Sequence, residues 1–529
     1  MSSSSEKEKS PHPVFVHLSK LSTKLDSFGV ESRGIERIEP YERSTNKTKA
    51  ILQVFGLWMA AAGGLSSLSS FVLGPLVFEL GFKDSLIYGF FGQFLGCVIA
   101  AYCSIMGPRS GCRQMVGARY LFGWWLVKLV ALVAIIGVVG WSVTNSVLGG
   151  QILMTVSNDK VPIEVGIIIV ALVSVVVSIF GIRQLLRVEI FLSIPILISF
   201  LLMYISIAPD YKYIYQSQSI GDKATIRGHQ LSFFALAYSV TSTWGSIASD
   251  YYLIFPETTS DLEVFSITFM GILVPTTFTS TLGILLGNVA AVYQPWNDMY
   301  STNGLGGLLT IAFDENWGAW SRLFSVLLFL SLITNNIINS YSAAFGIQLA
   351  GLWLAKVPRF IWVILVTIVY LVAALAGRNH FSEILGNFLP MIGYWISIYF
   401  ILLVEENVIF RNSHFYPRLF TKEHEVANDN SCTQFESSSR FYKLYHRPQF
   451  YNWTIWNDYD RLTNGYAAIA ASLAGVAGAV VGMNQTYYVG PISSFIGADG
   501  GDLGMWLSMA FAGVVYPGLR YLELKRFGR

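Results

Sequence analysis

Charged residues are scarce in this chain. Only 13% of its 529 residues are Asp, Glu, Lys or Arg, whereas soluble domains carry roughly 25%. Hydrophobic residues make up 53% of the sequence. This balance excludes an ordinary soluble domain and predicts a polytopic membrane protein that lies in a lipid bilayer. The net charge is only +2, and no basic stripe with interleaved aromatics occurs, so we expect no nucleic-acid partner.

Catalytic and metal-binding patterns are also lacking. The four cysteines show no CxxC spacing, and two of them fall inside hydrophobic stretches, which argues against a disulfide framework or a zinc site. All seven histidines fall in expected tails or loops, and HExxH, GxSxG and P-loop patterns are missing. We therefore expect no enzyme, no metal and no cofactor. The sequence points to no particular protein partner.

Long apolar runs dominate the rest of the chain. Residues 1–48 form a polar tail without the apolar core of a cleavable signal, so the first span must direct insertion. The runs that follow are each long enough to cross a bilayer, and only helices or closed barrels satisfy the backbone there. The strands of a membrane barrel would alternate apolar and polar residues, and these runs do not. The runs cover about 51–78, 85–106, 124–154, 162–182, 187–208, 231–255, 264–293, 321–352, 357–377, 381–410, 464–489 and 503–523.

The expected organisation follows from these runs. A transmembrane core at 49–410 precedes a polar loop at 411–463 and two further spans within 464–529. The short connections that carry several arginines, such as the one from Arg109 to Arg119, are expected on the cytoplasmic side. About twelve spans, an even number, place both termini in the cytoplasm.

Three asparagines stand inside the run at 321–352. Asn335, Asn336 and Asn339 belong to TNNIINSYS, and their i, i+3 and i+4 spacing puts them in one sector of a helix. An unpaired amide is costly in lipid, so the three must face a bundle interior or a cavity. Helix-to-helix hydrogen bonding would explain one isolated asparagine, but three on one face favour a cavity that binds a solute.

Aromatic residues near mid-span extend this prediction. Trp141 and Asn145 are i and i+4 in the third span, and Trp244 lies in the sixth. Two indole plates with amides between them suit a flat, neutral, heteroaromatic solute, because rings stack on its faces and amides read its edge. A channel is less well suited to such a discrete site.

Few carboxylates lie within the spans. Glu189 begins the fifth span, and Asp250 lies six residues beyond Trp244. Either is a candidate proton carrier, and either could equally be a structural partner of an arginine such as Arg183 or Arg187. Glu405 and Glu406 close the tenth span and are expected to be solvated.

Two spans are interrupted in matching places. The first contains GGLSS (Gly63 to Ser67), and the sixth contains TWGS (Thr243 to Ser246); each reaches a proline eleven residues after its glycine. Paired interrupted spans are typical of transporters built from inverted repeats, although glycine and serine also serve tight helix packing. If the first ten spans form two repeats, these cover 51–208 and 231–410.

Long segments of the chain resemble the nucleobase-cation-symport-1 family, in its fungal purine-cytosine permease branch, and within it the vitamin B6 transporters. The resemblance runs from GVESRGIERIEPYERSTN to the C-terminal MAFAGVVYPGLRYLELKRFGR. Its most specific segments are GLWMAAAGGLSSLSSFVLGP, AAYCSIMGPRSGCRQMVGARYLFGWW, TNNIINSYSAAF and GRNHFSEILGNFLPMIGYWISIYFILLVEEN.

The resemblance implies an all-α, LeuT-like fold with a 5+5 inverted repeat and two C-terminal helices. It also implies proton-coupled import of vitamin B6 across the plasma membrane. By the same resemblance, Glu189 matches a functional acidic position. The positions that it implies for substrate binding are Ser67, Trp141, Asn145, Trp244, Asn335, Asn336 and Asn339.

The sequence departs from the family pattern in two places. Relatives that carry cytosine and purines read NNxPN in the eighth span, whereas Ile338 stands here in place of the proline. Sodium-coupled bacterial relatives have two adjacent hydroxyls before the first asparagine, where this chain has Ile333 and Thr334. We therefore expect a vitamin B6 importer with a co-transported proton rather than sodium. A nucleobase permease and a membrane sensor that does not transport are the alternatives.

Overall fold

The structure is almost entirely helical. A computed structural model of the chain describes residues 34–529 except 45, 181, 319, 413–415 and 425–450. Within these residues the only strands are the two-residue β1 (Asn484–Gln485) and β2 (Tyr488–Val489), so the predicted all-α fold is confirmed. Most of the predicted N-terminal tail and the middle of the 411–463 loop lie outside the described residues.

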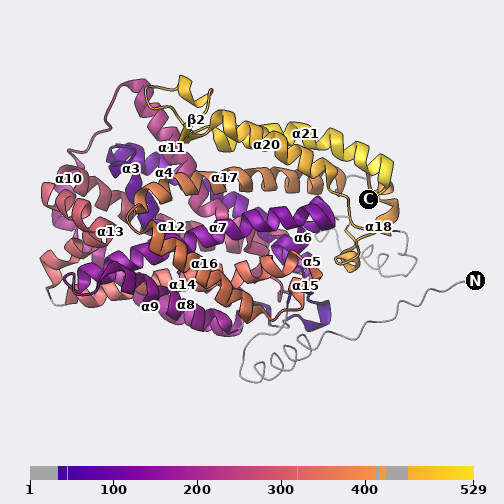
Figure 1. The fold of residues 1–529 in the computed structure, drawn as a ribbon, viewed down its shortest axis with the longest axis horizontal. Coiled ribbons are helices and arrows are strands. Elements are labelled where there is room, and N and C mark those ends of the chain that lie inside the picture. Colours follow the sequence, from indigo (N-terminus) through magenta and orange to yellow (C-terminus); the bar gives the residue numbers. More distant parts are fainter. Residues whose placement is uncertain (1–33, 45, 181, 319, 413–415, 425–450) are drawn as a thin grey trace, which may run out of the picture.

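Helical segments occupy the places of the predicted spans (Figure 1). They are α2 (Lys47–Ala62) with α3 (Leu65–Leu76), α4 (Phe82–Ser104), α7 (Arg119–Val156), α8 (Ile163–Ile179), α9 (Ile182–Ser206), α11 (Lys223–Ser242), α12 (Asp261–Val292), α14 (Trp320–Leu349), α16 (Arg359–Gly377), α17 (Phe381–Glu405), α20 (Tyr466–Gly482) and α21 (Gly504–Phe527).

Length and composition identify many of these helices as membrane spans. In the described part of the chain, seven helices are long and apolar enough to cross a membrane, or eight if the bent pair Phe191–Ser206 and Ala208–Ile214 is one span. Apolar side chains on them face outward: Leu129 is 55% exposed, Val372 61% and Val514 82%. Such exposure suits a lipid surface, because the hydrocarbon core is as apolar as leucine.

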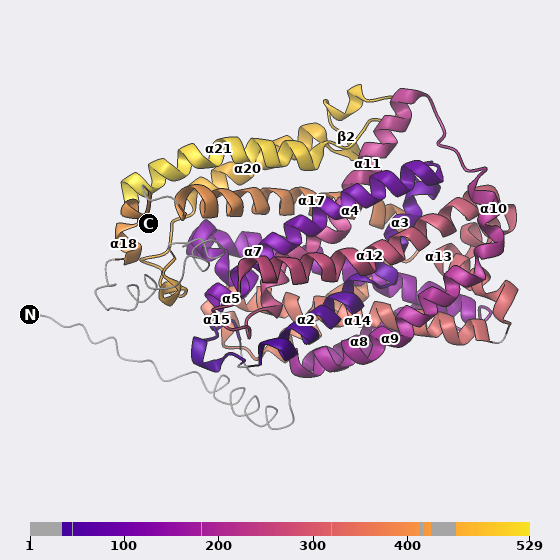
Figure 2. The same ribbon diagram turned by 180° about the vertical axis from the view of Figure 1, so that it is seen from behind.

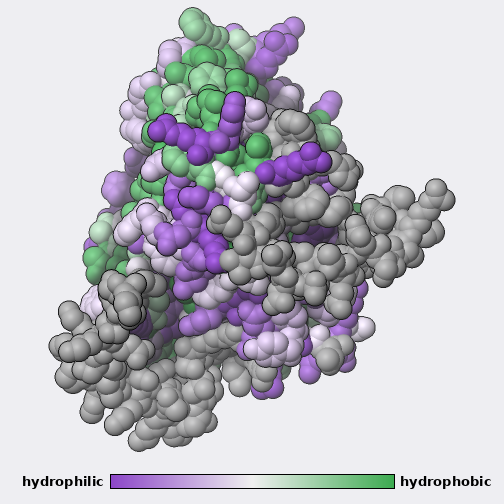
Figure 3. Space-filling model, turned by 90° about the vertical axis from the view of Figure 1, so that its right-hand side faces the viewer, coloured by the Kyte–Doolittle hydropathy of each residue, from purple (hydrophilic) through white to green (hydrophobic). Residues whose placement is uncertain are grey.

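The helices form an elongated bundle. The pair α20 and α21 lies along one edge, with α17 beside it, and α8 and α9 lie along the opposite edge in both views (Figures 1 and 2). The connection from α20 to α21, which contains β1 and β2, marks one end of the bundle, here named the hairpin end. The C-terminal end of α21 marks the other, here named the C-terminal end. Hydrophilic residues gather on that second end (Figure 3), as expected where helices leave the membrane.

The first span is interrupted as predicted. Helix α2 ends at Ala62, Gly63 and Gly64 leave helical geometry, and α3 begins at Leu65. A β-carbon at Gly63 would lie 2.6 Å from the Met59 carbonyl oxygen and 2.6 Å from the Pro275 ring, so only glycine fits this contact. The freed Leu65 N–H donates to the Ser331 hydroxyl of α14 at 3.0 Å, which ties the break to the asparagine-bearing helix.

The sixth span is interrupted too. Helix α11 ends at Ser242 and continues as two 3₁₀ turns, η3 (Thr243–Ser246) and η4 (Ala248–Tyr251), separated by Ile247 at φ −136° and ψ 0°. The two predicted interruptions are therefore both present. Each exposes backbone donors and acceptors in the middle of the bundle.

One helix was not expected. Residues 294–317, between the seventh and eighth spans, form α13 (Gln294–Trp317), with a non-helical residue at Gly304. Its first half, QPWNDMYSTNG, is polar and contains no apolar run, so hydropathy did not indicate a helix there. A helix of this kind depends on packing against its neighbours rather than on lipid.

The expectation that Glu406 is solvated was wrong. Its carboxylate is completely buried and accepts from Arg411 Nε at 2.9 Å, Arg520 Nε and Nη2 at 3.1 Å each, and the Tyr516 hydroxyl at 2.9 Å. Arg411 also donates to both oxygens of Glu423 at 2.8 Å. These five residues, named the Glu406 cluster, join the end of α17 to α21. Sequence alone did not bring together partners that lie more than a hundred residues apart.

Candidate functional site

The three asparagines of α14 point into the interior of the bundle. Their exposed fractions are 4% for Asn335, 0% for Asn336 and 3% for Asn339. Asn335 Oδ1 accepts from Asn339 Nδ2 at 2.9 Å, and Asn335 Nδ2 donates to the Ala61 carbonyl oxygen at 3.1 Å. The amides thus form a connected row that reaches the break in the first span.

Asn145 of α7 completes this row from the other side. Its Nδ2 donates to the Oδ1 atoms of Asn335 at 2.8 Å and Asn336 at 2.9 Å, and its own Oδ1 accepts from the Ser66 hydroxyl at 2.6 Å. The Asn336 amide also donates to Ser146 Oγ at 3.2 Å. Hydrogen bonds therefore join α3, α7 and α14 through one buried amide network.

A small cavity, named the central cavity, lies beside this network. Its volume is about 20 Å³, enough for about one water molecule. The conformation is consequently closed around the site. The lining residues are Ser66, Ser67, Val138, Trp141, Val240, Thr243, Trp244, Ile247, Asn335 and Asn339.

The lining separates the predicted site residues into two groups. Five of them face the cavity, namely Ser67, Trp141, Trp244, Asn335 and Asn339. Asn145 and Asn336 do not line it and lie behind it, in the hydrogen-bonded network. The i, i+4 spacing of Trp141 and Asn145 placed both on one helix face, but it could not show that the amide turns toward α14.

Sequence reasoning missed half of the cavity wall. Ser66 and Thr243 adjoin residues that were singled out, so the interrupted segments could have indicated them. Val138, Val240 and Ile247 carry no such signal, because Val and Ile fill any transmembrane helix.

Asn339 provides the free acceptor of the cavity. Its Nδ2 is engaged by Asn335, but among the described residues no donor lies within hydrogen-bond distance of its Oδ1. The hydroxyl hydrogens of two lining serines are already engaged: Ser67 donates to the Ala62 carbonyl at 2.7 Å, and Ser66 donates to Asn145. Asn339 Oδ1 is thus an amide acceptor that a solute hydroxyl or N–H can use.

A second tryptophan supports Trp244. The ring of Trp58 meets that of Trp244 edge to face, with centroids 5.5 Å apart, and Trp58 Nε1 donates to the Tyr252 hydroxyl at 3.1 Å. Edge-to-face pairs of buried rings are mutually attractive, which holds the Trp244 plane in place.

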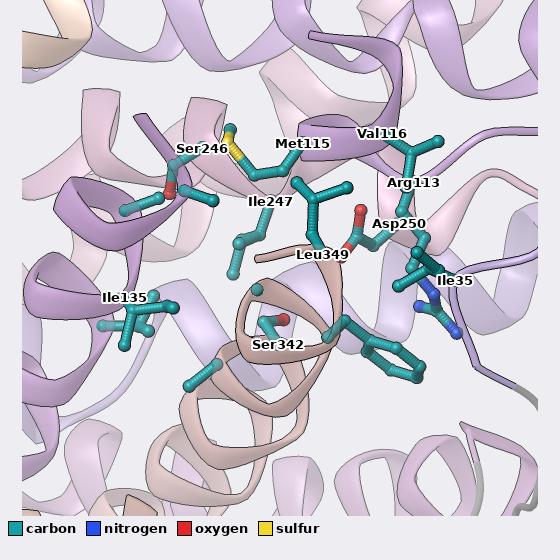
Figure 4. Close-up of a pocket in the computed structure, with 16 residues that line it drawn as sticks. Ile35, Arg113, Met115, Val116, Ile135, Ser246, Ile247, Asp250, Ser342 and Leu349 are labelled. Atoms are coloured by element: carbon teal, nitrogen blue, oxygen red, sulfur yellow. The ribbon is translucent and has the colours of Figure 1, made fainter. Parts of the chain in front are cut away.

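A second small cavity, named the Asp250 cavity, adjoins the first and is lined by Arg113, Ile247 and Asp250 among others (Figure 4). The two share Val138 and Ile247, so these side chains separate them. Asp250 is 5% exposed, and its Oδ1 accepts from the Gln114 backbone N–H at 2.7 Å. Arg113 lies on the same wall, with its guanidinium carbon 3.2 Å from the centre of the Phe345 ring.

The two candidate proton carriers differ in what the structure describes. Asp250 belongs to the interrupted part of the sixth span and is buried in the wall of the Asp250 cavity. Glu189 belongs to α9, but its side chain lies outside the described residues.

The backbone carbonyls at the first break are occupied by protein donors. Ala61 accepts from Asn335, and Ala62 accepts from Ser67 at 2.7 Å and from Thr276 Oγ1 at 3.2 Å. The hydroxyl of Thr334 donates to the Ser331 carbonyl at 2.9 Å. Each of these backbone carbonyl oxygens therefore accepts at least one hydrogen bond from a side chain.

Residues 40–412 match the family of permeases for cytosine/purines, uracil, thiamine and allantoin. The chain belongs to this permease family. It is accordingly a multi-pass membrane transporter rather than an enzyme, which confirms both expectations. The permease is 55% identical to the vitamin B6 transporter TPN1 of Saccharomyces cerevisiae, over 96% of this chain and 90% of that protein.

Two other proteins place the permease in a wider group. It is 31% identical to the purine-cytosine permease fcyB of Emericella nidulans, over 98% of this chain and 92% of that one. Its fold is that of the nucleobase-cation-symport-1 transporter MHP1, solved in a closed conformation with bromovinylhydantoin bound. The TM-score is 0.66, with 14% identity over 94% of this chain and 97% of the other. The LeuT-like fold class expected from the sequence is thereby confirmed.

Proposed function

We propose that this permease imports vitamin B6 across the plasma membrane, with pyridoxine as its main substrate and pyridoxal and pyridoxamine as further candidates. The observation that carries the proposal is the 55% identity to a vitamin B6 transporter along nearly the whole chain. Purine-cytosine permeases of the same family are much less similar, at about 31%.

The central cavity supplies suitable chemistry for a substituted pyridine. Trp141 and Trp244 offer ring faces on which a flat heterocycle stacks, and Asn339 offers an acceptor for a hydroxyl group. Asn335 shares the cavity wall. Asn145 holds the Asn335 amide, which in turn accepts from Asn339, and Asn336 anchors Asn145 from behind. Ser67 lines the central cavity from helix α3.

Ile338 favours vitamin B6 over a nucleobase. Helix α14 runs without interruption from Trp320 to Leu349, and Ile338 is fully buried in its middle. The proline found here in nucleobase carriers would remove one backbone hydrogen bond and bend the helix. Because α14 lacks this proline, we expect it to position Asn335 and Asn339 differently from a helix that the proline bends.

Proton coupling is part of the proposal. Ile333 stands where sodium-coupled bacterial relatives have a hydroxyl, which argues against a sodium site of their kind. Asp250 and Glu189 are the candidate carriers. Both termini are proposed to be cytoplasmic.

The test is uptake of labelled pyridoxine into cells that lack their own carrier, with cytosine, adenine and allantoin as competitors. Saturable uptake that is abolished by an uncoupler and unaffected by cytosine is expected. Cytosine uptake with indifference to pyridoxine would instead establish a nucleobase permease, the second candidate, which the family description and the 31% relative favour. Binding without accumulation would indicate a sensor.

Two conservative variants identify the carrier. If Asp250 exchanges the proton, Asp250→Asn flattens the dependence of uptake on external pH, whereas Glu189→Gln keeps it. The reverse result assigns the role to Glu189. A pH profile unchanged in both variants would remove both residues from coupling.

A further inference from the structure

The largest of the three cavities described in this chain lies away from the central one. It has a volume of about 800 Å³ and sits between the start of α17, the end of α3 and the connection from α20 to α21. This space, named the hairpin cavity, falls within the range of pockets that hold small organic ligands. The central cavity, at about 20 Å³, is far below it.

The sixth span relates the cavities to one another. Ser232 lines the hairpin cavity, Val240 and Thr243 line the central cavity, and Asp250 lines the Asp250 cavity. Ser232 and Val240 are eight residues apart on α11, which is about 12 Å along a helix. The hairpin cavity therefore lies on the hairpin side of the central site.

Helix α17 separates the two spaces in this conformation. The ring of Phe388 fills the position that a β-carbon of Gly140 would take, at 1.9 Å, and Gly393 packs against Ser239 of α11. A solute can thus occupy the hairpin cavity while the central cavity is closed.

One residue that lines the hairpin cavity has a polar atom without a partner. Gln485 is only 4% exposed, and its Nε2 donates to the Tyr394 hydroxyl at 2.8 Å and to Asp502 Oδ2 at 3.4 Å. Its Oε1 is buried and has no hydrogen-bond donor in the described part of the chain. Buried acceptors are rarely left without a hydrogen bond, and a donor group of a bound solute would supply one here.

The remaining wall is apolar on one side and acidic on the other. Phe78, Val77, Pro390 and Val489 provide apolar surface, whereas the charged lining residues are the acids Glu383, Asp499 and Asp502. Asp499 pairs with His229 at 3.1 Å. Burial raises the pKa of the Asp502 carboxyl to about 6.

We propose that the hairpin cavity is a second binding site of the permease, which holds a small heteroaromatic solute through its hydrogen-bond donors. This solute is the transported substrate, so the inference rests on the proposed function. The ring lies against Phe78, one donor group meets Gln485 Oε1, and further donor groups meet the carboxyl oxygens. The site gathers substrate while the central cavity is closed.

Gly386 allows the site to be filled without breaking any contact. It lines the hairpin cavity from α17, and a β-carbon there meets no heavy atom within 4 Å. Gly386→Trp therefore projects an indole into the cavity. Gly518→Trp is the matched control, because Gly518 of α21 has equally open surroundings and does not line the cavity.

The experiment counts bound tritiated pyridoxine by equilibrium dialysis of the purified full chain in detergent. The wild type and Gly518→Trp are expected to bind two molecules per chain, and Gly386→Trp and Asn339→Ala one each. The double variant Gly386→Trp/Asn339→Ala should bind none. Gln485→Leu removes the free acceptor and should weaken one of the two sites by up to about tenfold, the value of one hydrogen bond. Gln294→Leu, an exposed glutamine outside the cavity, is its control.

The outcomes separate the two proposals. One bound molecule in the wild type, lost in Asn339→Ala and kept in Gly386→Trp, overturns the second site while uptake of pyridoxine continues. Absence of both binding and uptake overturns the proposed function and the second site together. If Gly386→Trp does not fold, an unweakened Gln485→Leu overturns the proposal by itself.

Discussion

At the scale of single residues, the two groups of amides have separable roles. Asn339 faces the central cavity with a free Oδ1, whereas Asn145 lies behind it and makes three hydrogen bonds to side chains of α3 and α14. Asn339 is therefore placed to bind a solute, whereas Asn145 stabilises the packing of the helices. Sequence position alone gives both residues the same description.

Alanine variants distinguish these roles. Asn339→Ala is expected to abolish pyridoxine uptake while the melting temperature stays close to that of the wild type. Asn145→Ala leaves several buried partners unsatisfied and should lower the free energy of unfolding by about 1–3 kcal/mol. Uptake assays with surface biotinylation, and thermal melts in detergent, measure the two effects. Normal uptake by Asn339→Ala would remove that residue from the site.

The Glu406 cluster makes a second prediction at this scale. Glu406→Gln takes away the charge that faces Arg411 and Arg520, and breaking a buried ion pair on one side costs about 3–5 kcal/mol. We expect a large fall in melting temperature and poor surface expression. The neighbouring Glu405→Gln is the control, since no ion pair is described for Glu405. The melting temperature of this variant should stay near that of the wild type. Equal melting temperatures for the two variants would show that the Glu406 cluster does not stabilise the protein as expected.

At the scale of helices, the interruption of the first span depends on close contact. The β-carbon of an alanine at position 63 would collide with the backbone of Met59 and the ring of Pro275. Gly63→Ala should therefore destabilise the protein by about 1–3 kcal/mol and lower the uptake rate at least tenfold. Gly518→Ala, in open space on α21, should be neutral or slightly stabilising. Unchanged transport by Gly63→Ala would show that the break tolerates a side chain.

The same scale shows what the sequence could predict. Hydropathy located the long spans, and the motifs around Gly63 and Thr243 indicated the interruptions, because glycine and hydroxyl residues have local signatures. Helix α13 and the burial of Glu406 were beyond reach, since both depend on partners distant in the chain. The direction in which Asn145 turns was also undetermined, because a helix face can meet either a cavity or another helix.

At the scale of the whole molecule, the proposed orientation has a direct test. Gly386 of α17 lines the hairpin cavity shortly after the end of α16, and the exposed Lys356 lies just before the start of α16. In a Cys432→Ser background, Gly386→Cys should react with a membrane-impermeant maleimide on intact cells. Lys356→Cys should react only after permeabilisation.

The other native cysteines, Cys97, Cys103 and Cys112, are buried and should stay silent. The opposite pattern would place the hairpin end inside the cell and invert the direction assigned to every cavity. Labelling of Gly386→Cys that decreases when pyridoxine is added would in addition support the second site.

The smallness of the central cavity bears on how affinity is to be interpreted. A space of about 20 Å³ has to expand before a pyridine ring fits, so the bound state is selected from a minority of open molecules. The apparent Kd then equals the intrinsic Kd divided by the open fraction. A substitution far from the site that merely favours opening will tighten binding, and a series of variants ranked by affinity alone will report conformational equilibria as much as contacts with the substrate.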